Sequence, residues 1–324
     1  MFLVHNSPEQ AHLIASAIVG ACRLPSGWSA PTQPEILRVL FQKLIGFDGD
    51  FNNLAPIEPA VIKSILSTPL QRRELIELMV TMEMLCNPVP RELQRSVDKW
   101  AQALDVDDRV LWLARDLSRK SLARATIDFY RLNWIGESDP KSDPYFQSLL
   151  AHYGPTAYAL TVEPDEKETA RWRPLEFCPA GSLGRALWEF YRRSGFRLPG
   201  EVGGANAALA QHDWVHVIAG YEATAIGELE VTAFMAAASK APGAMLGFVG
   251  AVSLYETGLL GSLVTHGYSQ TLSKGDGVER VANAISRGRK CRVDPLIGVD
   301  YFTMSSMLLM DVREAWGVRE THNA

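Results

Sequence analysis

The sequence predicts an all-α protein made of two helical domains. Apolar residues recur at spacings of three and four along most of the chain, whereas the alternation typical of strands is nearly absent. The polar segment 137–144, with two Asp-Pro steps, interrupts this pattern, because proline removes an amide donor and disfavours helix at the preceding residue. We therefore expect a helical domain over residues 1–136, a linker over 137–144 and a helical bundle over 145–320.

The helices of the first domain are marked by their starts and stops. Residues 11–21 are apolar and favour helix, and Pro34 fits the first turn of a second helix. Thr68-Pro69 opens another helix that Asn87-Pro88 ends, and a long one is expected from Asp107 towards Tyr130. The apolar positions that define these faces are Ile36, Leu37, Leu40, Phe41, Leu44, Leu75, Leu78, Met79, Met82, Leu85, Leu93, Val97, Trp100 and Leu104.

This half also carries Gly46-Phe47-Asp48-Gly49-Asp50 between two expected helices, and a helical pair that ends near Leu104-Asp105-Val106. On these features it resembles the TerB-like helical domains. Acidic residues that follow a helix could bind a cation, but Asp and Gly are also the usual turn residues. A solvated turn is the interpretation that we favour.

In the second domain, Pro179 to Ser182 leads into a helix with Leu183, Leu187, Phe190 and Tyr191 on one face. A glycine-rich turn, residues 200–204, precedes the next helix. Alanine-rich helices are expected over 226–239 and from Met245 onward. The last helix is expected over 301–316, with inward positions at Met304, Met307, Leu308 and Val312.

The composition is that of a soluble globular protein, with 47% hydrophobic and 21% charged residues among 324. A net charge of -5 argues against a nucleic-acid partner. The four cysteines lie far apart and the N-terminus lacks the pattern of a signal peptide, which favours a reduced, cytoplasmic protein. The most apolar stretch, 241–272, is interrupted by Glu256, so no membrane span is expected.

The candidate metal ligands are His212, Asp213, His216 and Glu228. In a helix the two histidines project from one face at positions i and i+4 and can share an ion. Asp213 could join the ion from the helix edge, or hold a ligand imidazole as its hydrogen-bond acceptor. A straight helix would carry Glu228 about 18 Å beyond His216.

Gly220 and Gly227 are well placed to turn the chain back, since glycine ends helices at little cost. We therefore expect Glu228 in the first turns of a second helix packed against the first, with the metal site between the two helices. Nitrogen and oxygen ligands without a thiolate suit Zn, Fe(II) or Mn. Asp213 and Glu228 are also the candidate catalytic residues, as proton donor or acceptor.

The spacing His212-Asp213-x-x-His216, then eleven residues, then Glu228, resembles the signature of the Coq-four family of ubiquinone-biosynthesis proteins. These four residues match the family's proposed zinc ligands. Gly220, Gly227-Glu228-Leu229 and the late Arg313-Glu314 pair also agree, over about residues 145–320. The first 136 residues lie outside the resemblance, which puts a direct transfer of partners and location in doubt.

The resemblance implies a zinc-dependent lyase that removes the carboxyl group from C1 of a prenylated ring, with hydroxylation of that carbon. It implies binding of a prenylated quinone precursor or another isoprenoid lipid, with other quinone-biosynthesis proteins and a homodimer as further partners. Residues 234–263 are a candidate tunnel for the tail, although plain helix packing is the interpretation favoured there. The basic run 287–292 could contact lipid head groups on the inner face of a membrane, with a solvated loop favoured instead.

Two alternatives use the same residues differently. In the first, the metal is structural and the protein is a non-catalytic scaffold that binds prenyl lipid. In the second, His212-Asp213 is the central dyad of an HD-type phosphohydrolase. That family also needs an upstream His and a downstream Asp, for which His152 and Asp276 are the candidates, in no convincing helical context.

Overall fold

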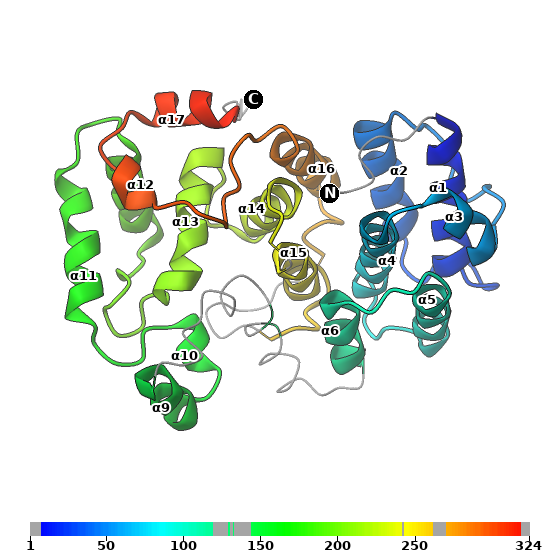
Figure 1. The fold of residues 1–324 in the computed structure, drawn as a ribbon, viewed down its shortest axis with the longest axis horizontal. Coiled ribbons are helices and arrows are strands. Elements are labelled where there is room, and N and C mark those ends of the chain that lie inside the picture. The colour runs from blue at the N-terminus through cyan, green and yellow to red at the C-terminus, as the bar shows by residue number, and fades with distance from the viewer. Residues whose placement is uncertain are drawn as a thin grey trace.

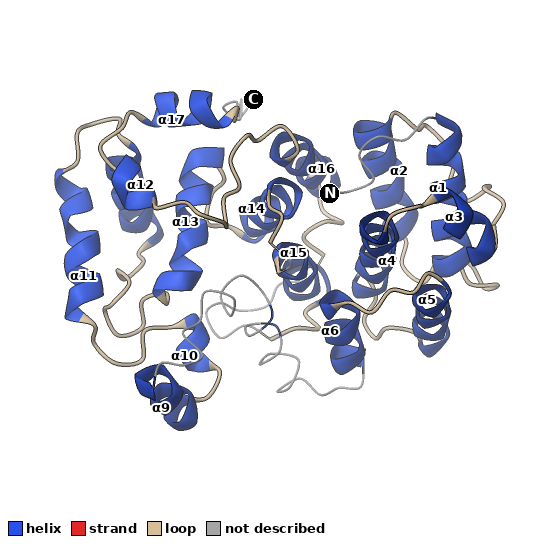
Figure 2. Cartoon of the chain, in the orientation of Figure 1, coloured by secondary structure: helices blue, strands red, loops and turns tan. Residues whose placement is uncertain are grey.

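The computed structural model describes residues 8–118, 129, 132, 144–241, 243–261 and 270–318. All regular elements in these ranges are helices, and no strand occurs among them, which confirms the all-α class (Figure 2). Residues 137–143 of the expected linker, and the expected continuation of a helix towards Tyr130, lie outside the described residues.

The first half of the chain forms a group of helices around α4, which is buried along most of its length (Figure 1). Thr68 begins α4 with a capping box, in which its side chain accepts a hydrogen bond from the backbone N–H of Gln71. The predicted starts and faces agree with the elements α1 (Pro8–Cys22), α2 (Thr32–Ile45), α4 (Pro69–Met84), α5 (Arg91–Ala103) and α6 (Arg109–Ser118). The short helix α3 (Pro59–Ile65) was not expected.

The loop after α2 matches the solvated turn that the sequence favours. Gly46 ends α2 with a positive φ of 73°, and the side chains of Asp48 and Asp50 are exposed. The Asp50 carboxylate accepts hydrogen bonds from the backbone of Asn52 and the side chain of Asn53. It therefore closes the turn locally, while the likeness to TerB domains stays a prediction.

The second half places α13, which carries the two motif histidines, between α12 and α14. Figure 1 shows α11, α12, α13 and α17 on one side of α14–α16, and the first half of the chain on the other. The elements are α9 (Pro144–Tyr153), α10 (Thr156–Ala159), α11 (Glu166–Trp172), a 3-10 turn (Arg173–Phe177), α12 (Leu183–Ser194), α13 (Ala207–Ala219), α14 (Ala225–Ala238), α15 (Ala244–Val252), a π-turn (Ser253–Thr257), α16 (Gly277–Gly288), a 3-10 turn (Tyr301–Met304) and α17 (Leu309–Trp316).

The two halves share one continuous core of buried apolar side chains. Polar contacts join α2 to α16 as well: Lys43 pairs with Glu279 at 2.7 Å, and the Arg289 guanidinium donates to the Leu44 carbonyl at 2.9 Å. Arg287, in the last turn of α16, donates to the carbonyl of Ala219. The two arginines hold helix ends, so this part of the basic run is not the solvated loop that the sequence favoured. The domain boundary itself stays a prediction.

The expected helix over 301–316 is wrong in its middle. A 3-10 turn and α17 replace it, and Met307 and Leu308 are each 45% exposed, although Val312 is buried as predicted. The segment between them pairs with the start of α12 instead: Leu183 N–H donates to the Met307 carbonyl at 2.9 Å. The first amides of α12 have no partner within their own helix, so they donate to carbonyls of the segment around Met307. That segment therefore does not form the helix that was predicted.

The alanine-rich helices that were a candidate tunnel are closely packed. The α14 and α15 side chains are almost all buried, and the cavity found beside Phe248 and Val252 measures about 10 Å³. That volume holds at most a water molecule. Within the described segments, no helix combines the length and apolar character that a membrane span requires.

Candidate metal centre

The helix α13 presents its two histidines to the next helix. The Asn206 side chain caps the start of α13 by accepting from the Ala208 N–H at 2.9 Å, and Gly220 ends it with a φ of 77°. His212 and His216 lie one turn apart, with ring centroids 5.2 Å from each other. The common face that was predicted from their i, i+4 spacing is therefore present.

A short turn brings Glu228 back to these rings. Thr224 caps α14 by accepting from the Gly227 N–H at 3.2 Å, and Glu228 follows within the first turn of that helix. Its Oε1 atom lies 3.3 Å from His216 Nε2, and its Oε2 atom lies 3.5 Å from His212 Nε2. The predicted return of the chain, with Glu228 at the start of a packed second helix, is confirmed.

The geometry of these three side chains fits a metal ion. One ligand atom from each of His212, His216 and Glu228 lies within 4.8 Å of the others. Ligands about 2.1 Å from a tetrahedral ion lie about 3.4 Å from one another, close to the two nitrogen–oxygen distances observed. A charge-assisted hydrogen bond would be shorter, at about 2.7–2.9 Å.

Both imidazoles are oriented by their other nitrogen. The Nδ1–H of His212 donates to the Leu209 carbonyl at 2.5 Å, and that of His216 donates to the Tyr221 carbonyl at 3.2 Å. Once Nε2 is deprotonated, as metal binding requires, this arrangement leaves the two Nε2 lone pairs facing Glu228. The Nε2 atom of His216 is buried and makes no hydrogen bond to the part of the chain that the structure describes, which is the arrangement expected of a ligand atom.

The electrostatics of the cluster favour a cation. The His216 side chain is fully buried, and 23% of the Glu228 side chain is exposed. Burial lowers the pKa of His212, but the carboxylates of Asp213 and Glu228 outweigh it and raise that pKa to about 9. Burial raises the pKa of Glu228, but the two histidines lower it well below its usual range. The Glu228 carboxylate thus stabilises positive charge on the histidines, and a divalent ion bound at their Nε2 atoms would take the place of the protons there.

Asp213 lies outside this group of three, behind His212. Its Oδ1 atom is 3.4 Å from His212 Nδ1, on the ring edge opposite Glu228, and its Oδ2 atom accepts from the Tyr191 hydroxyl at 2.5 Å. Burial raises the pKa of the Asp213 carboxyl. The hydrogen bond to Asp213 thus comes from Tyr191, while the His212 Nδ1–H already donates to the Leu209 carbonyl, and which of the two roles Asp213 has stays a prediction.

Two aromatic residues of α12 complete the surroundings of the cluster. Phe190 stacks on the His216 ring with centroids 5.4 Å apart, and Tyr191 holds Asp213. The sequence predicted both on the inner face of α12, where nothing signalled a polar partner for the tyrosine. Neither His152 in α9 nor Asp276 before α16 belongs to the cluster, so the geometry does not favour the phosphohydrolase dyad.

Two arginines from distant helices satisfy the last carbonyls of α13. Arg313 of α17 donates to the carbonyls of Val217 and Ile218, at 3.1 and 2.9 Å, and Arg287 of α16 donates to that of Ala219 at 2.7 Å. Cations at a helix C-terminus also oppose the negative end of the helix dipole. These contacts fix the end of the helix that carries His216.

We expect Arg313→Met to lower the free energy of unfolding by about 1–3 kcal/mol, because it leaves buried carbonyls without a donor. The Arg193→Met control changes a side chain that is 61% exposed and whose ion pair is 3.9 Å long; it should change stability by less than about 0.5 kcal/mol. Urea unfolding followed by circular dichroism compares the two. Equal midpoints would show that Arg313 does not support α13.

Comparison with known proteins gives one distant structural neighbour. No family model matches the sequence, and a search of curated proteins found no match. A crystal structure named "Putative ubiquinone biosynthesis protein", from Nostoc punctiforme, is 15% identical and covers 75% of this chain and 97% of its own, with a TM-score of 0.35. So low a TM-score supports no conclusion about this protein's activity.

Proposed function

We propose that His212, His216 and Glu228 bind one divalent transition-metal ion, with zinc expected first and iron or manganese as alternatives. The convergence of their ligand atoms within 4.8 Å carries this proposal. We assign Asp213 the role of a positioning residue, held by Tyr191 and acting on His212. Three protein ligands leave a fourth position for water or substrate, as in catalytic sites.

The substrate that we propose is a prenylated aromatic acid of quinone biosynthesis, on the strength of the sequence motif. When bound, the ion supplies positive charge that holds the substrate carboxylate and a neighbouring phenolic oxygen. Decarboxylation breaks the bond between C1 and the carboxylate, releases CO₂ and leaves the electron pair on the ring. Replacement of the carboxyl group by a hydroxyl group is a two-electron oxidation of the substrate, in which dioxygen and water are consumed and CO₂ and hydrogen peroxide are released. We expect a substrate to approach from the exposed side of Glu228.

The buried surroundings define what the protein itself contributes. Phe190 and the packed α14 exclude water from the inner side of the His216 ring, which strengthens electrostatic interactions there.

The proposal also includes expectations about partners and location. We expect contact with other quinone-biosynthesis proteins, a homodimer, and attachment to the inner face of the membrane from the cytoplasm.

A labelled substrate tests the proposed reaction. Purified protein is incubated with a prenylated 4-hydroxybenzoate carrying ¹³C in its carboxyl group, and the ¹³CO₂ released is measured by mass spectrometry. We expect release by the wild type and its loss in Glu228→Gln, with Glu222→Gln as control, an exposed glutamate outside the cluster. Binding of the lipid without CO₂ release would identify the non-catalytic scaffold instead.

A further inference from the structure

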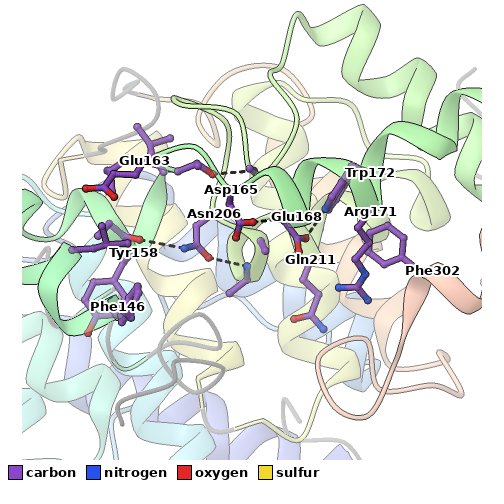
Figure 3. A pocket seen from close by; sticks show the side chains of 18 of the residues that line it. Phe146, Tyr158, Glu163, Asp165, Glu168, Arg171, Trp172, Asn206, Gln211 and Phe302 are labelled. Carbon is purple, nitrogen blue, oxygen red and sulfur yellow. Dashed lines mark hydrogen bonds between the residues drawn. The ribbon is translucent and has the colours of Figure 1, made fainter. Parts of the chain in front are cut away.

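A second candidate site is a cavity of about 490 Å³ on another face of α13 (Figure 3). None of the three proposed metal ligands lines it, although Gln211 and Trp214 of the same helix do. Its volume lies in the range of pockets that bind small molecules. The buried indoles of Trp172 and Trp214, with centroids 5.8 Å apart, belong to its wall.

The charged groups around this cavity are mainly acidic. Among the described residues, Arg171 is the one cationic side chain in the lining, against four carboxylates: Glu163, Asp165, Glu168 and Asp300. Two of them lie among aromatic groups: Glu168 accepts from the Trp172 indole at 2.7 Å, and Glu163 accepts from the Tyr145 hydroxyl at 3.1 Å. An apolar wall with an acidic excess favours a positively charged ligand.

The cavity wall already holds one cation in this way. The Arg171 guanidinium lies 3.9 Å from the centroid of the Phe302 ring and 3.2 Å from Asp300 Oδ1. Figure 3 shows Arg171, Phe302 and Trp172 side by side at one end of the cavity. Aromatic faces attract cations through their quadrupole, so the same wall chemistry suits a second cation.

The Gln211 side chain adds a polar group to the cavity. It lines the pocket and makes no hydrogen bond to any of the described residues, whereas the Asn206 amide is used up by the Ala157 carbonyl and the Ala208 N–H. The side-chain amide oxygen of Gln211 is therefore available to accept a hydrogen bond from the ammonium group of a ligand.

We propose that this cavity binds a small organic cation with an aromatic body, such as an arylalkylamine. The ring of the ligand would lie against the aromatic wall and its ammonium group would face Glu168 and the Gln211 side-chain oxygen, with Glu163 adding negative charge at the other end of the cavity. This site does not depend on the proposed metal. It lies beside the same helix as the cluster, but none of the three proposed metal ligands lines it.

Three probes of similar shape and different charge test the proposal: phenethylamine, 2-phenylethanol and 3-phenylpropionate. Affinities are measured by saturation-transfer NMR in the presence of a chelator, so that coordination of the amine to a metal does not contribute. We expect the amine to bind about tenfold more tightly than the alcohol, and the propionate more weakly than both. Equal affinity for amine and alcohol, or no saturable binding, would overturn the proposal.

Matched variants locate the binding. The double variant Glu163→Gln/Glu168→Gln removes two negative charges and keeps a side-chain oxygen that accepts from the Trp172 indole. We expect it to lose most of the preference for the amine over the alcohol. Glu166→Gln, an exposed change in α11 outside the cavity, should leave that preference intact. An unchanged preference in the double variant contradicts this site. Unchanged binding of 2-phenylethanol shows that the cavity persists, and His216→Ala should not affect the amine.

Discussion

His216→Ala should abolish metal binding, because this substitution removes a ligand that nothing else replaces. The His216 side chain is fully buried, and its Nε2 atom has no hydrogen-bond partner among the described residues. Loss of a residue that only supports a ligand typically costs 10- to 100-fold in metal affinity. We therefore expect the affinity for the metal to fall by more than about a hundredfold. Plasma mass spectrometry should find about one ion per chain in the wild type and only a trace in the variant.

The control is His152→Ala, since His152 is exposed in α9 and belongs to no ligand group among the described residues. It should keep the wild-type metal content. Because a ligand that binds only the folded state stabilises it, a chelator should also lower the melting temperature of the wild type and of His152→Ala, and leave that of His216→Ala unchanged. Equal metal in wild type and His216→Ala would remove the basis of the proposed centre.

The hydrogen bond from Tyr191 to Asp213 marks the limit of what the sequence could predict about the cluster. The motif specified His212 and His216 because helix geometry alone fixes an i, i+4 pair. The hydroxyl that holds Asp213 comes from α12, 22 residues earlier in the chain, and it has no local signature in the sequence. Sequence spacing predicts neighbours within one helix, and it does not predict the partner that a different helix supplies.

The same limit explains the errors in the fold. Amphipathic helices such as α5 and α12 were predictable because their apolar residues follow the helical period. The basic run was misinterpreted because the partners of Arg287 and Arg289 are carbonyls of α13 and α2, 68 and 245 residues away. The last helix was predicted too long because the competing contact, between Leu183 and Met307, is also distant in sequence.

Gly227→Ala should have the largest effect on the fold around the cluster. A methyl group at this position would lie 1.9 Å from the carbonyl oxygen of Glu222 and 2.9 Å from its carbon. These are backbone atoms of the tight turn between α13 and α14, and they cannot move aside as a flexible side chain could. We expect a loss of about 1–3 kcal/mol or more in the free energy of unfolding, as for other overpacked sites.

The same substitution should weaken metal binding, because the turn that must shift sets the position of Glu228, the next residue. Gly261→Ala is the matched control: no atom of the described residues lies within 4 Å of the added methyl group, so stability should change by less than about 0.5 kcal/mol. Urea unfolding and metal content are measured together on both variants. A Gly227→Ala protein with wild-type stability and a full complement of metal would show that the turn tolerates a side chain, and that the approach of α14 to α13 does not depend on glycine there.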